Sequence, residues 1–394
     1  RQIATLRDAA PIGNALTASA LARARDAGIA DLERRASAIF VERIVPALQR
    51  QSAALAALLP RADDRAGIWA KPDGEAYYAS ALHSNTTASY APGELHQLGL
   101  AWVEELSAEI DQLLRAQGLA RGSVGERMAA LDRDPRFLKP DTEAGRQAII
   151  DYASAHLDRI KGLLPRGFRV IPDRPVEVQR ISPAIQDGAP GAFYSASSDP
   201  AQTSTIFLNL RSVAENALWR IPTLLHHEGI PGHHFQDSVL SEAGGLSLFR
   251  RTVRFSAWTE GWALYAEQLA DEMGAFESDP FGRIGYLQGQ LFRACRVVVD
   301  TGLHHARWTR QHAIDWMVAN AGEHRDAAER EIDRYCVYPG QACSFMVGKQ
   351  QILATREKAR QRLGTRFDTR AYNDFILASG PLPMDVLDGA AALA

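Results

Sequence analysis

The sequence predicts a mainly α-helical protein with a small β-sheet. Long segments carry apolar residues at helical spacing, and several of them begin at a Ser, Thr or Pro start signal. Between residues 168 and 210 the pattern changes to short segments rich in β-branched residues, bounded by Pro, Gly, Ser and Asp. Helical patterns return at Pro222 and continue to about Arg362. These features together indicate helices with one sheet inserted among them.

The first part of the chain is expected to form a helical lobe over residues 1–165. Residues 15–58 alternate apolar and charged positions and are rich in Ala, Leu, Arg and Glu, which favour helix. A break containing Gly and Asp follows at 61–78. Helical patterns, the last two opened by a Ser or Thr cap, then cover 93–114, 123–134 and 142–164. The Pro-Arg-Gly sequence at 165–167 ends this block.

The second part, residues 166–394, is expected to hold the sheet and the functional helices as one integrated unit. The predicted strands are 168–172, 176–182 and 203–210. In the last of these, Ile206, Leu208 and Leu210 alternate with other residues, as in a strand with one buried face.

Composition excludes several functional classes. The 394 residues are 46% hydrophobic and 23% charged, as in an ordinary globular protein, and the net charge of −3 argues against broad affinity for nucleic acid or an anionic membrane. No apolar run approaches the ~20 residues of a membrane span. The three cysteines, which we expect to be unpaired, form no disulfide framework and no CxxC metal site. Because the sequence starts at Arg1 without Met, we expect a leader or longer segment to have been removed.

The segment 226–236, HHEGIPGHHFQ, concentrates four of the eleven histidines next to a glutamate. In a zinc-protease helix, H-E-x-x-H places two His one turn apart with the Glu beside them. Here His233 follows His227 by six residues, so a straight helix would place it roughly 240° around and about 9 Å along the axis. A regular helix therefore cannot bring the two imidazoles together.

Pro231 changes this geometry, because it cannot donate to the carbonyl of His227 and would clash with it. The helix must bulge or break there, and Gly229 and Gly232 lower the steric cost. A two-residue bulge would bring His233 back over His227. The alternative is a polar helix end with surface histidines, where Pro231 simply opens a new helix.

A third ligand is offered by the amphipathic segment 254–273, where Glu260 is flanked one turn away by apolar residues. A carboxylate on such a surface is costly to bury unless it meets a cation, and a zinc ion would supply one. Glu267, on the same face, would be either a partner of a ligating His or an ordinary surface charge.

Several motifs resemble the bacterial domain-of-unknown-function family 885. They are HEGIPGHHFQ, TEGWALYAE, the segments 292–309 and 333–352, and upstream pieces at 77–87, 93–100 and 191–200. The resemblance spans nearly the whole chain. The family is regarded as related to the gluzincin metallopeptidases, which use two His and a downstream Glu, so the resemblance implies two helical lobes around a gluzincin-like zinc-hydrolase cleft.

The resemblance also implies roles for individual residues. His227 and His233 are the expected zinc ligands with Glu260 as the third, and Glu228 is the expected general base. His234 remains the rival of His233, because the length of the bulge cannot be read from the sequence. One zinc ion per chain is expected, although similar sites accept cobalt or manganese.

Relatives commonly carry Tyr-Lys where this chain has Phe345-Met346. This difference bears on specificity or activity if the pair touches substrate.

Further catalytic candidates lie downstream. A zinc peptidase needs a donor for the oxyanion, usually His, Tyr or Arg. His304 is one candidate, and Arg296, Asp300 and His304 are spaced to form a linked row on one helical face, or else a surface ion pair. Tyr335 with its neighbour Arg334 could bind a carbonyl or carboxylate. If the substrate has a free carboxylate, either Arg296 or Arg334 could bind it.

The sequence therefore predicts a zinc-dependent hydrolase that cleaves peptide or amide bonds of small or extended substrates, with water activated by Glu228. The strand 203–210 is expected to be an edge strand that, with Tyr194, pairs with the substrate backbone. The alternatives are a zinc hydrolase of a non-peptide amide or ester, and a catalytically silent binding protein on the same fold. We expect a soluble bacterial protein, either cytoplasmic or exported, whose partner is a small peptide or amide.

Overall fold

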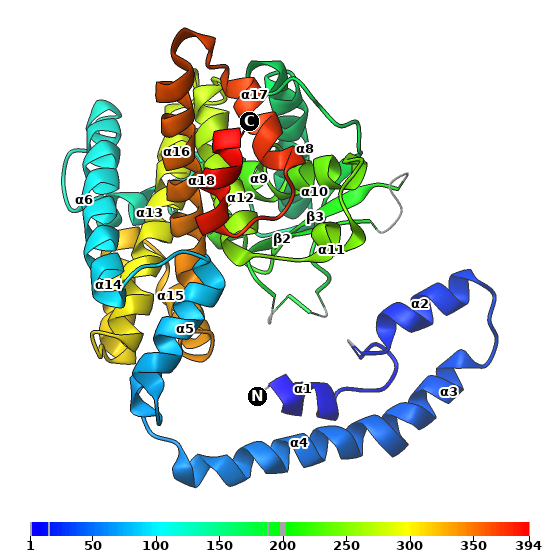
Figure 1. Ribbon diagram of the computed structural model, residues 1–394. Helices are drawn as coiled ribbons and strands as arrows, with labels where there is room; N and C mark the ends of the chain where they lie inside the picture. The colour runs from blue at the N-terminus through cyan, green and yellow to red at the C-terminus, as the bar shows by residue number, and fades with distance from the viewer. Residues whose placement is uncertain (1, 15, 184, 187–188, 198–201, 394) are drawn as a thin grey trace. The chain divides into compact units, whose positions relative to one another are not determined.

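The computed structural model describes residues 2–14, 16–183, 185–186, 189–197 and 202–393 (Figure 1). These residues are mainly helical and contain one three-stranded sheet, as predicted. The chain divides into two compact units. One comprises residues 1–64 and 181–190, and the other comprises 65–180 and 191–394. The predicted boundary at residue 165 falls inside the larger unit, which contains every candidate site residue.

The smaller unit holds the helices α1 (Gln2–Asp8), α2 (Ala18–Asp26), α3 (Leu32–Ile39) and α4 (Val45–Leu58), with a π-helical turn at Phe40–Ile44 and a 3-10 turn at Leu59–Arg61. The predicted helical segment 15–58 is interrupted between α2 and α3. Gly28 there has a φ of 66°, which L-residues with side chains rarely adopt, and its N–H donates to the Arg25 carbonyl at 3.0 Å. Gly28 therefore ends α2.

The larger unit begins with α5 (Gly74–Thr86), α6 (Pro92–Ala116), α7 (Val124–Leu131) and α8 (Glu143–Lys161). The two predicted caps are confirmed. Ser123 and Glu126 form a reciprocal capping box at the start of α7, and the Thr142 hydroxyl accepts from the Gly145 N–H at 3.1 Å at the start of α8. Helix α5 begins inside the segment 61–78, which the sequence indicated as a break.

The sheet contains β1 (Val176–Arg180), β2 (Ala192–Ser195) and β3 (Ser204–Leu208), in the order β1-β3-β2. Strand β3 pairs parallel with β1 and antiparallel with β2. It is therefore the central strand, and the predicted edge position of 203–210 was wrong. Ile206 and Leu208 of β3 are fully buried, as their alternation predicted, and they pack with apolar residues of α8 and of the next helix, α9 (Ile221–Glu228).

The strand predicted at 168–172 does not form. The N–H groups of Arg169 and Val170 donate to the Asp374 carboxylate at 3.1 and 3.5 Å, so this backbone pairs with a side chain and not with a strand.

The remaining helices are α10 (His233–Glu242), α11 (Leu248–Thr252), α12 (Ser256–Glu272), α13 (Pro280–His304), α14 (Arg310–Ala321), α15 (Arg325–Val337), α16 (Ser344–Leu363), α17 (Thr369–Ala378) and α18 (Met384–Leu393). Short 3-10 turns lie at Ile68–Ala70, Leu164–Arg166, Val213–Glu215, Gln341–Cys343 and Gly364–Arg366. Helical structure thus extends beyond the predicted end near Arg362. Across the described residues no helix combines the length and apolar character needed to cross a membrane.

Helices α12 and α13 form the centre of the larger unit, where α13 packs along α6 and α12 packs along α16 (Figure 1). Close approach of α12 and α16 depends on two glycines. A Cβ on Gly348 would lie 2.0 Å from the Ala257 carbonyl oxygen, and one on Gly261 would lie 2.5 Å from the Gly348 backbone. Gly261 directly follows Glu260, so this crossing holds the segment of α12 that carries Glu260 against α16. Cys295 and Cys343 are buried, and all three cysteines are unpaired as predicted.

Candidate metal centre

The histidine segment forms two helices separated by a sharp break. Helix α9 ends at Glu228 and α10 begins at His233, with a cis Ile230-Pro231 peptide between them. Gly232 lies so close to the preceding turn that a Cβ would be 1.9 Å from the His227 carbonyl oxygen. Only glycine tolerates this approach. The predicted break at Pro231 is confirmed. The chain folds back so that His233, the first residue of α10, lies beside His227, and the predicted two-residue bulge within one helix does not form.

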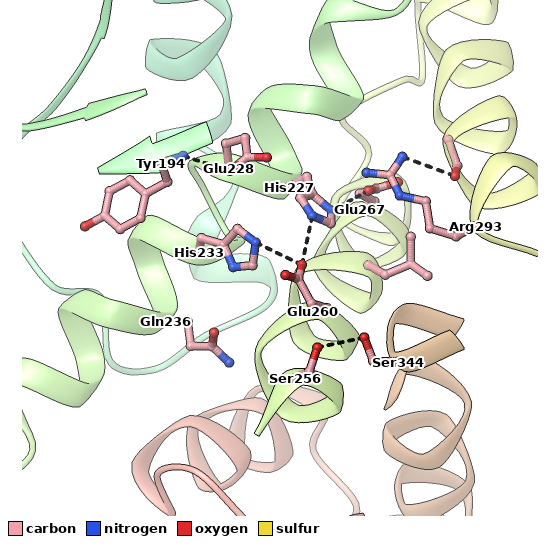
Figure 2. A network of polar contacts seen from close by, with 12 residues as sticks. Tyr194, His227, Glu228, His233, Gln236, Ser256, Glu260, Glu267, Arg293 and Ser344 are labelled. Atoms are coloured by element: carbon pink, nitrogen blue, oxygen red, sulfur yellow. Dashed lines mark hydrogen bonds and ion pairs between the residues drawn. The ribbon is translucent and has the colours of Figure 1, made fainter. Parts of the chain in front are cut away.

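This path brings three ligand-type side chains together (Figure 2). Glu260 Oε2 lies 3.6 Å from His227 Nε2 and 3.4 Å from His233 Nε2. The two imidazole rings are nearly perpendicular, with centroids 4.9 Å apart. One ligand atom from each of the three residues lies within 4.8 Å of the other two. In the part of the chain that the structure describes, this is the group that could hold a metal ion.

The spacing of these atoms suits zinc. A tetrahedral ion with bonds of about 2.1 Å holds its ligand atoms about 3.4 Å apart, close to the separations of Glu260 from the two imidazoles. Two imidazoles and one carboxylate are also a donor set found in catalytic zinc sites, where a fourth position stays open. The side chains of His233 and Glu260 are 15% and 23% exposed, whereas His227 is 3% exposed. The group is therefore enclosed on the His227 side and open to solvent on the other.

The sequence left open whether Glu267 is a partner of a ligating His or an ordinary surface charge. In the structure Glu267 is a buried partner of His227. The His227 Nδ1–H donates to Glu267 Oε1 at 2.8 Å, and the side chain of Glu267 is 1% exposed. Thr223 and Gln290 donate to the other carboxylate oxygen at 3.0 and 2.9 Å. This bond keeps a proton on Nδ1, so that Nε2, which faces Glu260, is the ring nitrogen that can bind a metal ion.

The electrostatics of the cluster follow from this pairing. Burial alone would lower the pKa of His227, but Glu260 and Glu267 outweigh it and raise the pKa to about 9. Burial opposes ionisation of Glu260, yet His227 and His233 hold the pKa of its carboxyl far below its ordinary value. His227 and Glu260 thus carry opposite charges that attract each other before any cation binds.

Glu228 follows His227 directly, at the end of α9. Its Oε2 accepts a hydrogen bond from the Tyr194 N–H of β2 at 3.0 Å (Figure 2). Tyr194 is paired with Ile206 in the antiparallel ladder, and because its N–H bonds Glu228 this N–H faces the free edge of β2 and not β3. The structure therefore joins the edge of the sheet to the expected general base.

His234, the rival ligand, points elsewhere. Its Nε2–H donates to the Arg174 carbonyl at 3.0 Å, and its Nδ1 accepts from the Tyr194 hydroxyl at 3.4 Å. Burial lowers its pKa to about 4. The structure brings His233, and not His234, to the ligand group.

The predicted row on α13 does not form as a set of linked side chains among the described residues. His304 is fully buried, and both ring nitrogens bind main chain: Nδ1 accepts from the Ile68 N–H and Nε2–H donates to the Tyr335 carbonyl, each at 3.0 Å. Asp300 accepts from the Tyr78 hydroxyl at 2.7 Å and from the Gly340 N–H at 3.0 Å. His304 and Asp300 therefore anchor neighbouring segments to α13.

Arg296 is linked to the cluster through Phe345, whereas Tyr335 pairs with a carboxylate of its own helix. Arg296 Cζ is 3.9 Å from the centroid of the Phe345 ring, which stacks at 15° to His227 with centroids 6.0 Å apart. The Tyr335 hydroxyl donates to Glu331 Oε2 at 2.6 Å, and Arg334 also pairs with Glu331 at 2.7 Å. Phe345 thus places an apolar ring beside His227.

Comparison with known proteins supports the resemblance seen in the motifs. The family described as "Bacterial protein of unknown function (DUF885)" matches residues 1–390. The chain belongs to this family. No curated protein matches this DUF885 chain.

Two solved structures are similar to this DUF885 chain. One, described as "the putative lipoprotein from Colwellia psychrerythraea", is 39% identical with a TM-score of 0.90 over 92% of this chain. This chain spans 62% of the length of the Colwellia protein. The other, described as "a putative lipoprotein of unknown function from Shewanella oneidensis", is 20% identical with a TM-score of 0.72, over 94% of this chain and 69% of that one, and shares the fold.

Proposed function

We propose that this protein is a zinc-dependent hydrolase that cleaves peptide or amide bonds of small or extended substrates. The observation that carries the proposal is the convergence of His227, His233 and Glu260, with Glu228 following His227 at the end of α9. A bound zinc ion would act as a Lewis acid on the scissile carbonyl and lower the pKa of a water molecule. The proposed gluzincin-like cleft would lie between α9, α10 and α12, which carry the three ligand-type residues.

In this proposal Glu228 is the general base. It takes a proton from the attacking water and passes it to the leaving amine. The Tyr194 N–H holds one oxygen of the carboxylate and so restricts its orientation. Glu267, anchored by Thr223 and Gln290, holds the imidazole of His227 in place.

The sheet has a role in substrate binding. Strand β2 lies at an edge of the sheet and leads to Glu228 through Tyr194. An extended substrate adding to this edge would place its backbone next to the general base, as in other strand-addition complexes.

The test is a hydrolysis screen with Glu228→Gln. Zinc-loaded wild type and variant are incubated with mixed short peptides and amides, and products are identified by mass spectrometry. We expect wild type to cleave a subset, and Glu228→Gln to retain zinc while kcat falls by about 10²- to 10⁴-fold. Glu242→Gln, at the exposed end of α10, is the matched control and should keep full activity. Equal turnover by Glu228→Gln, or no cleavage by zinc-loaded wild type, would refute the proposal.

The description of the Colwellia relative as a lipoprotein also supports an exported location for this hydrolase. Cell fractionation tests this point, since an exported form would be recovered outside the cytoplasm and a purely cytoplasmic one would contradict it.

A further inference from the structure

Two arginines near the metal group form no ion pair of their own among the described residues. Arg293 and Arg296 lie three residues apart on α13 and so share a face of the helix. No carboxylate lies within the ion-pair distance of 4.0 Å of either guanidinium in the described part of the chain, and Glu267 and Glu331 act on Arg293 and Arg296 only from farther away. The Nε atom of each is buried without a hydrogen-bond partner. Their guanidinium groups make only long bonds of 3.4 Å, Arg293 to the Gly289 carbonyl and Arg296 to the Gln341 side chain.

A second buried arginine in the same molecule shows how unusual this is. Arg127 is 6% exposed and pairs with Asp111. Arg296 is 4% exposed and has no such partner, and its burial lowers its pKa. Buried charges are costly unless they are paired, so an unpaired guanidinium at this depth is a site where an anion would be stabilised.

The distance from the arginines to the metal group limits the length of a substrate that could reach both. Arg296 and Arg293 lie 3.9 and 5.9 Å from the centroid of the Phe345 ring, which itself lies 6.0 Å from that of His227. Figure 2 shows Arg293 beside Glu267, the partner of His227. An extended residue spans about 3.5 Å. A carbonyl at the metal group and an anion at the arginines would therefore be separated by one or two residues.

We infer that Arg293 and Arg296 bind the free carboxylate of the substrate, so that the substrates are peptides or N-acyl amino acids ending one or two residues beyond the cleaved bond. This inference rests on the proposed hydrolase function. Cleavage adds one water across the bond: the acyl part leaves as a new carboxylate, and the remainder leaves as an amino acid or dipeptide with a free amine.

The chemistry of the two side chains fits this ligand. A guanidinium offers planar, paired donors that match a carboxylate, and the bond strengthens where water is excluded. Arg293 is half-buried and Arg296 is deep, so a carboxylate meets Arg293 first and displaces the two 3.4 Å bonds. Arg334, the other arginine indicated by the sequence, is already neutralised by Glu331 at 2.7 Å.

The first test compares an N-acetylated pentapeptide as the free acid and as the C-terminal amide. Zinc-loaded wild type should cleave the acid with a kcat/KM about ten- to a hundredfold above that for the amide, releasing one or two residues. Arg293→Gln and Arg296→Gln should lose this preference by lowering only the rate on the acid, and Arg296→Lys should retain part of it. Arg283→Gln, also on α13 but paired with Asp271 and Glu109, should keep the full preference.

The second test measures binding of the same two peptides to zinc-loaded Glu228→Gln protein by calorimetry. We expect the acid to bind about ten- to a hundredfold more tightly, and the double variant Glu228→Gln with Arg296→Gln to lose the difference. If wild type cleaves neither peptide but this difference is found, the hydrolase proposal fails and the carboxylate site stands. Equal affinity for acid and amide, no binding of either, or variants that weaken both peptides equally would overturn the carboxylate site.

Discussion

His227 connects the ligand group to the interior of the protein. Its Nε2 faces Glu260, while its Nδ1–H is fixed by Glu267, which Thr223 and Gln290 hold in turn. Because such partners set the tautomer and raise the basicity of a ligating imidazole, their loss weakens metal binding even though they do not touch the metal.

We therefore predict that Glu267→Gln lowers zinc affinity by about 10- to 100-fold. Competition with a chromophoric chelator measures the change. Glu272→Gln is the matched control, because Glu272 lies on the same helix but pairs with Arg356 away from the cluster. An unchanged affinity in Glu267→Gln would show that Glu267 does not act through His227.

At the residue scale, the sequence indicated the candidate ligand group but not its surroundings. His227, His233 and Glu260 could be singled out because they are metal-ligand residue types. Pro231 must interrupt the helix between the two histidines, which removes the helical spacing that would keep them apart. The choice between His233 and His234 was left open, because the path of residues 229–232 depends on its fit against neighbouring helices.

Arg293 was missed altogether. Its significance lies in the absence of an ion-pair partner within 4.0 Å among the described residues and in the unpartnered Nε, which no sequence pattern records.

At the scale of elements, Glu260 depends on the crossing of α12 and α16. The two helices meet at Gly261 and Gly348 with backbone-to-backbone contact, so any side chain at either position pushes them apart. The same crossing places Phe345 of α16 against His227.

Gly348→Ala should therefore lower the free energy of unfolding by about 1–3 kcal/mol, the usual cost of overpacking, and weaken zinc binding in parallel. Urea denaturation with and without zinc measures both effects. Gly389→Ala is a suitable control, because a Cβ at this exposed position of α18 meets nothing within 4 Å. A neutral effect of Gly348→Ala would contradict the close crossing.

Helices were predictable where an apolar face recurs at helical spacing, as in α6, α8 and α12. The strand β2 was missed, because its four residues have no pattern of their own and pair only with the later strand β3. The segment 168–172 has the composition of a strand, but Asp374 takes its N–H groups from more than two hundred residues away. Long-range partners decided both outcomes.

At the scale of the whole larger unit, a buried ion cluster connects distant segments. Arg220, just before α9, pairs with Asp132 after α7 at 2.8 Å and with Glu323 after α14 at 2.9 Å. The side chain of Asp132 is 1% exposed. Burial alone would raise its pKa, but Arg220 and His324 outweigh this effect and hold the pKa below its ordinary value.

Since the pKa of Asp132 is depressed in the folded state, its contribution to stability is present above the unfolded value of about 3.9 and is lost as the pH falls through the folded value. Asp132→Asn should lower the free energy of unfolding at pH 7 by about 3 kcal/mol, because Arg220 loses a buried partner. The variant should also lose less stability than wild type as the pH falls, because it lacks the Asp132 carboxylate that becomes protonated in acid. Denaturation curves from pH 7 to pH 3 test both points, and parallel curves for variant and wild type would contradict them.

The central claim is that His227, His233 and Glu260 hold one metal ion, and zinc content tests it most directly. Elemental analysis of wild type and His234→Ala, after zinc loading and buffer exchange, should give about one zinc per chain. His227→Ala, His233→Ala and Glu260→Ala, each checked for folding by circular dichroism, should lose it. Wild type without zinc, or zinc retained in all three ligand variants, would contradict the account.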